Sequence, residues 1–83
     1  MSLRTAVRHL EERQWELAHT IAQADESALG CWAHGIVHLL EGDIDNARYW
    51  YGRSRRAFPK GAENDIDSEL RALSEAVARV EPG

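Results

Sequence analysis

The sequence predicts an all-α protein of about five antiparallel helices, in a single domain that spans residues 1–83. Apolar residues recur at spacings of three and four along most of the chain, which is the period of an amphipathic helix. No segment shows the strict apolar–polar alternation of a half-buried strand. The two prolines, Pro59 and Pro82, lie outside the apolar stripes. A chain of 83 residues supports one small core, so a second domain is not expected.

Two short helices are expected first along the chain. Ser2 is a good N-cap for the first, whose inward residues are predicted to be Leu3, Ala6, Val7 and Leu10. The second runs from about residue 14 to residue 24, and its predicted inward residues are Leu17, Ala18, Ile21 and Ala22. Both stripes are one-sided, as expected for helices that cover a core.

The third helix differs from the others in having no charged face. It is expected to start after Ser27 and to end near Glu41, and residues 27–40 include no Asp, Glu, Lys or Arg. A helix that is apolar nearly all round is normally buried among its neighbours. We therefore expect this helix at the centre of the fold.

Two further helices complete the prediction. Gly42 and Asp43 supply a helix stop followed by an N-cap. The fourth helix then ends before Pro59, with inward residues Ile44, Ala47, Tyr51 and Ser54. The loop 60–64 separates it from a last helix whose inward stripe is Ile66, Leu70, Leu73, Val77 and Val80.

A weak internal repeat pairs the first two helices with the next two. An offset of 29 residues aligns Ala6 with Gly35, His9 with His38 and Ala18 with Ala47, among others. Small residues at such positions let two helices cross closely. The repeat predicts that Gly35 and Ala47 face each other across a helix hairpin.

The second hairpin resembles a tetratricopeptide repeat (TPR). The residues that carry the resemblance are Cys31, Gly35, His38, Gly42, Asp43, Ala47, Tyr51, Ser54 and Pro59. His38 departs from the family pattern, which usually has a large aromatic there, and His34 stands where an aliphatic residue is usual. The resemblance implies right-handed TPR-like hairpins, a C-terminal capping helix and protein–protein binding through a groove.

A narrower resemblance covers about half of the chain. The string from His34 to His38, followed by Glu41-Gly42-Asp43, Asn46-Ala47 and Tyr49-Trp50, is similar to one found in a group of small uncharacterised helical proteins. That group implies no activity.

His34 and His38 are the residues best suited to bind a ligand. They are four residues apart on a helix, so both imidazoles project from one face, a spacing that suits zinc, nickel or iron. His19, Cys31 or Glu41 would complete a ligand set. A metalloprotease site is not expected, because Gly35 follows His34 where a Glu would act as base. The alternatives are a pocket for an organic ligand and two buried, hydrogen-bonded core histidines.

Aromatic and basic residues cluster further along the chain. Tyr49, Trp50 and Tyr51 are consecutive, so they cannot all point inward, and Tyr49 or Trp50 is expected at an edge where it serves ligand binding or hairpin packing. The cations that follow without an acid between them are Arg48, Arg53, Arg55, Arg56 and Lys60. Nucleic acid is an unlikely partner, because the net charge is −4 and such binding rests on neutralising phosphates.

Together these observations favour a non-enzymatic binding or scaffold module that recognises a protein or peptide, with a homodimer as a further expectation. The alternative is a small-molecule or metal-binding protein that uses His34 and His38, with His19, Tyr49 and Trp50 nearby. No cofactor is expected other than a divalent metal in this alternative. Cys31 is the only cysteine, which excludes an internal disulfide and fits the cytoplasm. No apolar run approaches the roughly 20 residues that cross a bilayer, so no membrane partner is expected.

Overall fold

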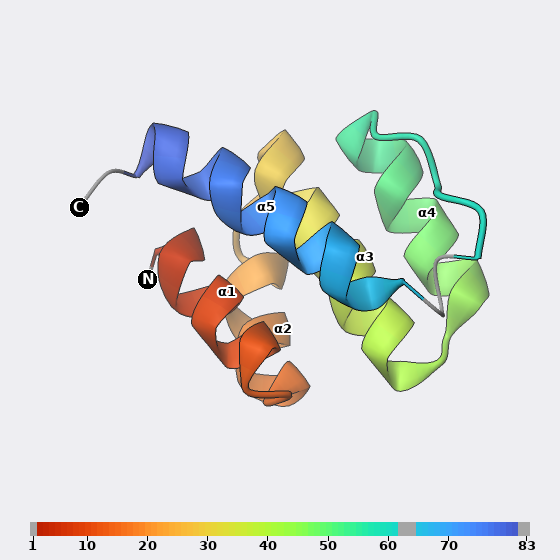
Figure 1. Cartoon of the computed structure of the whole chain (residues 1–83), viewed down its shortest axis with the longest axis horizontal. Helices are drawn as coiled ribbons and strands as arrows, with labels where there is room; N and C mark the ends of the chain where they lie inside the picture. The colour runs from red at the N-terminus through yellow and green to blue at the C-terminus, as the bar shows by residue number, and fades with distance from the viewer. Residues whose placement is uncertain (1, 62–64, 82–83) are drawn as a thin grey trace.

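The computed structural model describes residues 2–61 and 65–81, and within these ranges the chain is all-α (Figure 1). The described residues form five helices and no strand. These are α1 (Leu3–Glu11), α2 (Trp15–Gln23), α3 (Ala28–Glu41), α4 (Ile44–Ser54) and α5 (Ile66–Val80). The predicted fold class and helix order are therefore confirmed. The predicted loop 60–64 falls partly outside the described residues. None of the described helices is long and apolar enough to span a membrane.

Short polar side chains begin three of the helices, as the sequence predicts. Ser2 accepts a hydrogen bond from the backbone N–H of Thr5, and Ser27 accepts one from Gly30. Gly42 ends α3 in the left-handed conformation, with φ of 79°, and Asp43 then caps α4. Because these residues satisfy backbone groups that a helix end leaves unpaired, the boundaries of α3 are set locally.

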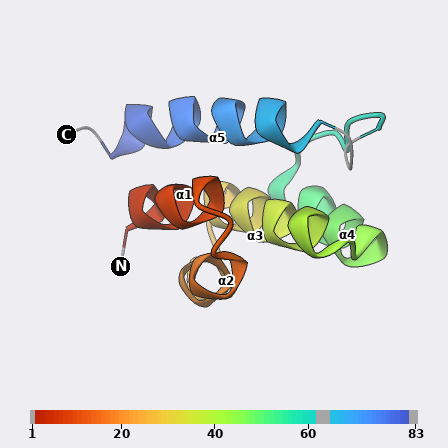
Figure 2. The same ribbon diagram turned by 60° about the horizontal axis from the view of Figure 1, so that its bottom comes forward.

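Helix α3 is the centre of the molecule. It contacts each of the other four helices, and nine of its residues are buried. Figure 2 shows α5 on one side of α1 and α3 and α2 on the other side. The hairpin α1–α2 and the hairpin α3–α4 are joined mainly through α2 and α3. The absence of charged residues from 27 to 40 therefore predicted the central position of α3 correctly.

Two residues of the predicted core are exposed instead. Leu17 has an exposed fraction of 52%, and Val80 has one of 62%. Helix α2 packs on α1 and α3 through Ala18, Ile21 and Ala22, so the side of the helix that carries Leu17 has no helix over it. Val80 is the last residue of α5, one turn beyond the buried Val77. In both cases the helical spacing is right, but the side chain lies outside the surface that the neighbouring helices cover.

Gly35 sets how closely α3 and α4 approach. A Cβ atom at this position would lie 2.6 Å from Cδ1 of Tyr51 and 3.3 Å from the carbonyl oxygen of Ala47. Both Tyr51 and Ala47 are fully buried. The predicted facing of Gly35 and Ala47 is confirmed, and it is the missing side chain of Gly35 that makes room for the Tyr51 ring.

The two ends of the described chain are held together. The carboxylate of Glu81, just after α5, accepts hydrogen bonds of 3.1 Å from the backbone N–H groups of Leu3 and Arg4. These N–H groups belong to the first turn of α1, where they have no partner within the helix and where the helix dipole favours a negative charge. Glu81 thus fixes the end of α5 to the start of α1.

Candidate metal centre between α2 and α3

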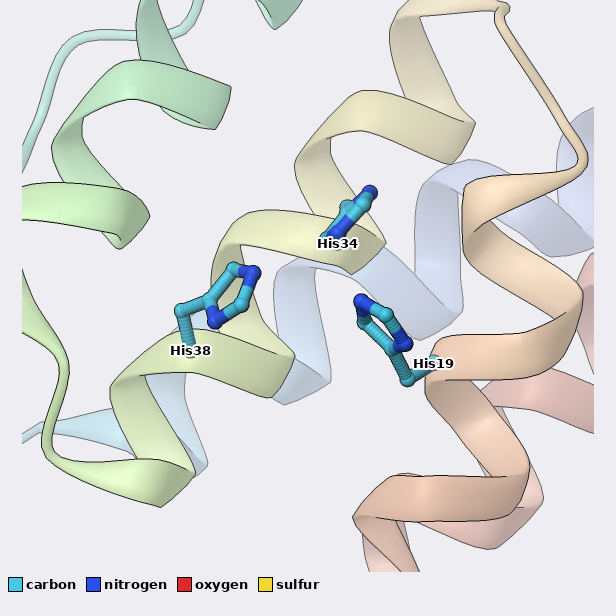
Figure 3. A group of neighbouring side chains, drawn as sticks. All are labelled: His19, His34 and His38. Carbon is cyan, nitrogen blue, oxygen red and sulfur yellow. The ribbon is translucent and has the colours of Figure 1, made fainter.

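Three histidines from two helices converge at the contact between α2 and α3. Figure 3 shows His19 of α2 directed toward His34 and His38 of α3, with the three rings around a common space. One ring nitrogen of each residue lies within 4.8 Å of the others. His34 is buried, and the other two are half-buried. The sequence predicted the pair on α3 and offered His19, Cys31 or Glu41 as a further ligand, and the structure brings His19 to the pair.

The rings pack against one another and against Trp50 of α4. The centroids of His34 and His38 are 5.0 Å apart in a stacked arrangement, and His19 meets His34 edge-on at 4.6 Å. The Trp50 ring stacks on His34 with a centroid distance of 3.9 Å and an interplanar angle of 11°. These contacts limit the movement of His34 in particular, so the site is partly preorganised.

The environment keeps His34 in its neutral form. Burial, followed by the repulsion of the positive charges that His19 and His38 carry when protonated, lowers the pKa of His34 from 6.5 to about 4. Neutral imidazole is the form that binds a metal ion, because its unprotonated nitrogen has a lone pair to donate. At neutral pH a metal therefore has no proton to displace from this ligand.

His38 has a ring nitrogen whose hydrogen-bonding capacity is unused. Its Nδ1 atom lies 2.8 Å from Oε1 of Glu41, one turn further along α3. The same nitrogen is buried and makes no hydrogen bond in the described part of the chain. A buried polar atom left in this state is costly, which favours a role other than packing for His38.

The other residues that the sequence offered as ligands lie elsewhere. Cys31 is buried on α3, and its Sγ atom lies 3.9 Å from the carbonyl oxygen of Glu26. Glu41 touches His38 but does not belong to the group of converging ligand atoms. His9, the fourth histidine, lies apart and pairs through Nδ1 with the side-chain oxygen of Gln14 at 2.9 Å. Of the three candidates for a third ligand, only His19 joins the pair.

The consecutive aromatic residues separate as their helical spacing predicts. Tyr51 is fully buried, Trp50 is half-buried against His34, and Tyr49 is 55% exposed on the outside of α4. Trp50 thus belongs to the histidine site. Tyr49 touches that site only through an edge-on contact with Trp50, at a centroid distance of 5.1 Å.

A second buried polar cluster, which the sequence analysis did not identify, surrounds Glu69 of α5. Its Oε1 atom accepts hydrogen bonds from the Tyr51 hydroxyl at 2.7 Å and from Nε1 of Trp32 at 3.2 Å. Arg56 binds both carboxylate oxygens, at 3.0 and 2.8 Å, and its guanidinium lies over the Trp32 ring. A sequence signal existed: Glu69 lies next to Leu70 and four residues before Leu73, on the core-facing side of its helix.

The bonds to Glu69 keep its carboxyl group ionised. Burial alone would raise the pKa of Glu69, but the hydrogen bonds from Arg56, Tyr51 and Trp32 outweigh it and lower the pKa below its usual value. Trp32, Tyr51 and Arg56 each donate at least one hydrogen bond to the Glu69 carboxylate. We therefore assign it a structural role, which is to fix α5 against α3 and α4.

Comparison with known proteins finds no matching family, no matching curated protein and no matching solved structure. The resemblance to tetratricopeptide repeats accordingly stays a prediction.

Proposed function

We propose that this protein binds one divalent transition-metal ion through His19, His34 and His38. The observation that supports the proposal is the convergence of three imidazole nitrogens from two helices within 4.8 Å. Around a tetrahedral zinc ion, ligand atoms at about 2.0–2.1 Å from the metal are roughly 3.3 Å apart. Small side-chain rotations would therefore close the site, without movement of the helices.

The donor set indicates the class of metal. Three imidazoles suit zinc, copper, nickel and cobalt better than the hard cations magnesium and calcium, which prefer oxygen. Three protein ligands also leave a fourth position for water or another donor. We propose a binding function rather than an enzymatic one. The metal would join α2 to α3, and so the first helix hairpin to the second.

Isothermal titration of tag-free protein with zinc tests the proposal. We expect one ion bound per chain, and a melting temperature that rises as zinc exceeds its dissociation constant, since a ligand at about 100 times that constant stabilises by roughly 2.7 kcal/mol. His19→Ala should abolish both the binding of zinc and the zinc-dependent rise in melting temperature. It should cost little stability, because His19 is only half-buried and lies on α2, outside the central helix α3.

His9→Ala is the matched control, because it removes a histidine that lies outside the site. It should bind zinc like the parent. If zinc, nickel, cobalt and copper all leave the parent's melting temperature unchanged, the three rings serve packing alone. The same conclusion follows if His9→Ala lowers zinc affinity as much as His19→Ala.

We further propose that the two hairpins are TPR-like and that the protein acts in the cytoplasm. The close crossing at Gly35 and the contact of α2 with α3 support the first point. The single buried thiol of Cys31 fits a reducing compartment. The homodimer stays a prediction, for which Trp15 and Leu17, 39% and 52% exposed, are the apolar side chains available on α2. Sedimentation velocity of the parent and of Trp15→Ala tests it.

A further inference from the structure

The outward face of α4 carries a glycine that no contact requires within the part of the chain that the structure describes. Gly52 is exposed within the helix, and a Cβ atom added to it would meet no heavy atom within 4 Å. Its φ angle is not positive, so the backbone makes no demand for glycine either. Glycine is the least favourable helix residue after proline. Glycine at position 52 therefore makes α4 less stable than alanine would, and no contact of the described residues explains it.

Three residues after Gly52, a residue other than glycine occupies a position that favours glycine. Arg55 ends α4 in the left-handed conformation, with φ of 64°, a position where helices usually have glycine. Its side chain is exposed. Thus glycine is absent where the backbone favours it and present where the backbone does not. Local violations of this kind are expected at functional sites.

The same face carries exposed positive charge that has no ion-pair partner among residues 2–61 and 65–81. Arg48, Arg53 and Arg55 are exposed, and among the described residues no carboxylate lies within ion-pair distance of them, whereas Arg13 and Arg56 are paired. Two of these guanidinium groups are held in place by aromatic rings. Arg48 lies over Phe58 at 4.4 Å, and Arg53 lies over Trp50 at 5.5 Å.

Arg48, Tyr49 and Arg55 flank Gly52 on the helix surface. Arg48 and Tyr49 precede Gly52 by four and three residues, the spacing of neighbours on one face, and Arg55 follows it by three. Tyr49 is exposed, and its hydroxyl accepts a hydrogen bond of 3.3 Å from Arg53. The face thus consists of ordered cations and one aromatic ring around a position with no side chain.

We propose that this face of α4, formed by Arg48, Tyr49, Gly52, Arg53 and Arg55, docks an acidic segment of another protein. Charge complementarity selects the occupant: the unpaired guanidinium groups are donors for carboxylates. Gly52 lets the backbone of the segment approach the helix closely, and Tyr49 provides apolar contact. The segment is a peptide rather than a nucleic acid, because the net charge of −4 repels a densely charged polyanion. The face borders the histidine site, because Arg53 lies over Trp50 and Trp50 stacks on His34, but it contains none of the three histidines.

The test uses a synthetic peptide in which Glu alternates with Ala, and a control peptide with Gln in place of Glu. Both are titrated at low salt into isotope-labelled protein, and amide chemical shifts are followed by NMR. We expect the Glu peptide, and not the Gln peptide, to shift the amides of α4. Added salt should weaken the binding, since exposed charges are screened.

Two variants separate docking from stability. Gly52→Ala should raise the melting temperature by about 4–8 °C, because a helix prefers alanine. Gly52→Leu should also keep the fold, since its side chain enters open space, but should weaken the Glu peptide by about tenfold or more through steric exclusion. If Gly52 only supported the fold, a substitution that keeps or raises the melting temperature would not weaken peptide binding.

The charge requirement is tested by replacing the three arginines, Arg48, Arg53 and Arg55, with glutamine. Affinity for the Glu peptide should fall by about tenfold or more, because each exposed pair contributes modestly and the three add up. Arg8→Gln is the matched control on the exposed side of α1, and it should change affinity less than about twofold.

Four results would overturn the proposal. They are an absence of α4 shifts at millimolar Glu peptide, equal shifts with the Gln peptide, parental affinity in Gly52→Leu, and binding of a single-stranded oligothymidine in preference to the Glu peptide.

Discussion

Two buried polar clusters lie on different faces of α3, and they differ in how completely their polar atoms are paired. Trp32, which belongs to the Glu69 cluster, and His34 are two residues apart, so they point about 200° apart around the helix. Glu69 accepts four hydrogen bonds of 2.7–3.2 Å from Trp32, Tyr51 and Arg56. In the histidine cluster the rings touch one another and a ring nitrogen of His38 is left without a hydrogen bond.

This difference supports the structural role that we assign to the Glu69 cluster and the binding role that we propose for the histidine cluster. A fully paired polar network gains nothing from a further ligand and holds its helices in one arrangement. A cluster in which His34 is held in its neutral form and Nδ1 of His38 makes no hydrogen bond would gain from a metal ion, which accepts lone pairs from imidazole nitrogens. Burial alone would not have distinguished the two clusters. Their hydrogen bonds do.

Removal of the Glu69 carboxylate should have the largest effect. Glu69→Ala leaves Arg56, Tyr51 and Trp32 without their acceptor, and we expect a loss of about 3 kcal/mol in the free energy of unfolding. Urea denaturation followed by circular dichroism measures it. Glu75→Ala, an exposed substitution on the same helix, should change stability by less than about 0.5 kcal/mol. If both substitutions lowered the free energy of unfolding equally, the structural role assigned to Glu69 would be wrong.

Acidification should destabilise the metal-free protein in two stages. The pKa of His34 is lowered from 6.5 to about 4, so between these values the unfolded chain binds more protons than the folded one. Stability is therefore present above pH 6.5 and is lost as the pH falls toward 4, by up to about 3 kcal/mol.

The second stage comes from Glu69, whose pKa is lowered from 4.5. The stability that it contributes is present above pH 4.5 and is lost as the pH falls through its folded pKa. Thermal melts from pH 8 to pH 3 with a chelator follow both stages. His34→Phe should flatten the first and keep the second; if it leaves the first unchanged, the titration belongs to another group.

The close crossing of α3 and α4 should be sensitive to a single methyl group. Gly35→Ala places a Cβ against the Tyr51 ring and displaces a donor of the Glu69 cluster, which should cost about 1–3 kcal/mol. Gly52→Ala, on the other side of the same hairpin, is the control and should stabilise. Thermal melts compare them. A Gly35→Ala protein that melts like the parent would show that the hairpin relaxes freely.

His38→Phe should have the smallest effect on stability and a complete effect on binding. It removes an unpaired buried nitrogen and supplies the aromatic ring that the repeat pattern usually has, so we expect stability to be kept or raised by up to about 1 kcal/mol. Zinc should no longer raise the melting temperature. A variant that still responds to zinc like the parent would exclude His38 as a ligand.

The sequence predicted what depends on local spacing and missed what depends on how far a neighbour extends. Caps at Ser2, Ser27 and Asp43 fixed helix starts, and the uncharged stretch from 27 to 40 located the central helix. Leu17 was misplaced because the extent of the surface that covers α2 is a tertiary property.

The two polar clusters were predictable to different degrees for the same reason. His34 and His38 share a helix, so their spacing alone placed them together, whereas the position of His19 required the packing of α2 on α3. Glu69 lies 37 residues from Trp32 and 18 from Tyr51. The contacts of Glu69 with these residues depend on how α5 packs, so the sequence alone could not predict them. The position of Glu69 on the core side of its helix could still have predicted a buried charge.

The contact of Glu81 with the first turn of α1 has a consequence for the order of events during synthesis. The N–H of Leu3 donates its hydrogen bond to a carboxylate 78 residues further along the chain, so this bond cannot form before Glu81 is synthesised. At roughly 5–20 residues per second, a ribosome adds that residue about 4–16 s after Leu3. Until then the N–H groups of Leu3 and Arg4 lack this acceptor, although Ser2 already caps α1 at Thr5. The caps of α3 and α4 lie between Ser27 and Arg55, so they are synthesised before Glu81. We therefore expect the central hairpin to become protected first on the ribosome, and the first helix to be the last to stop fraying.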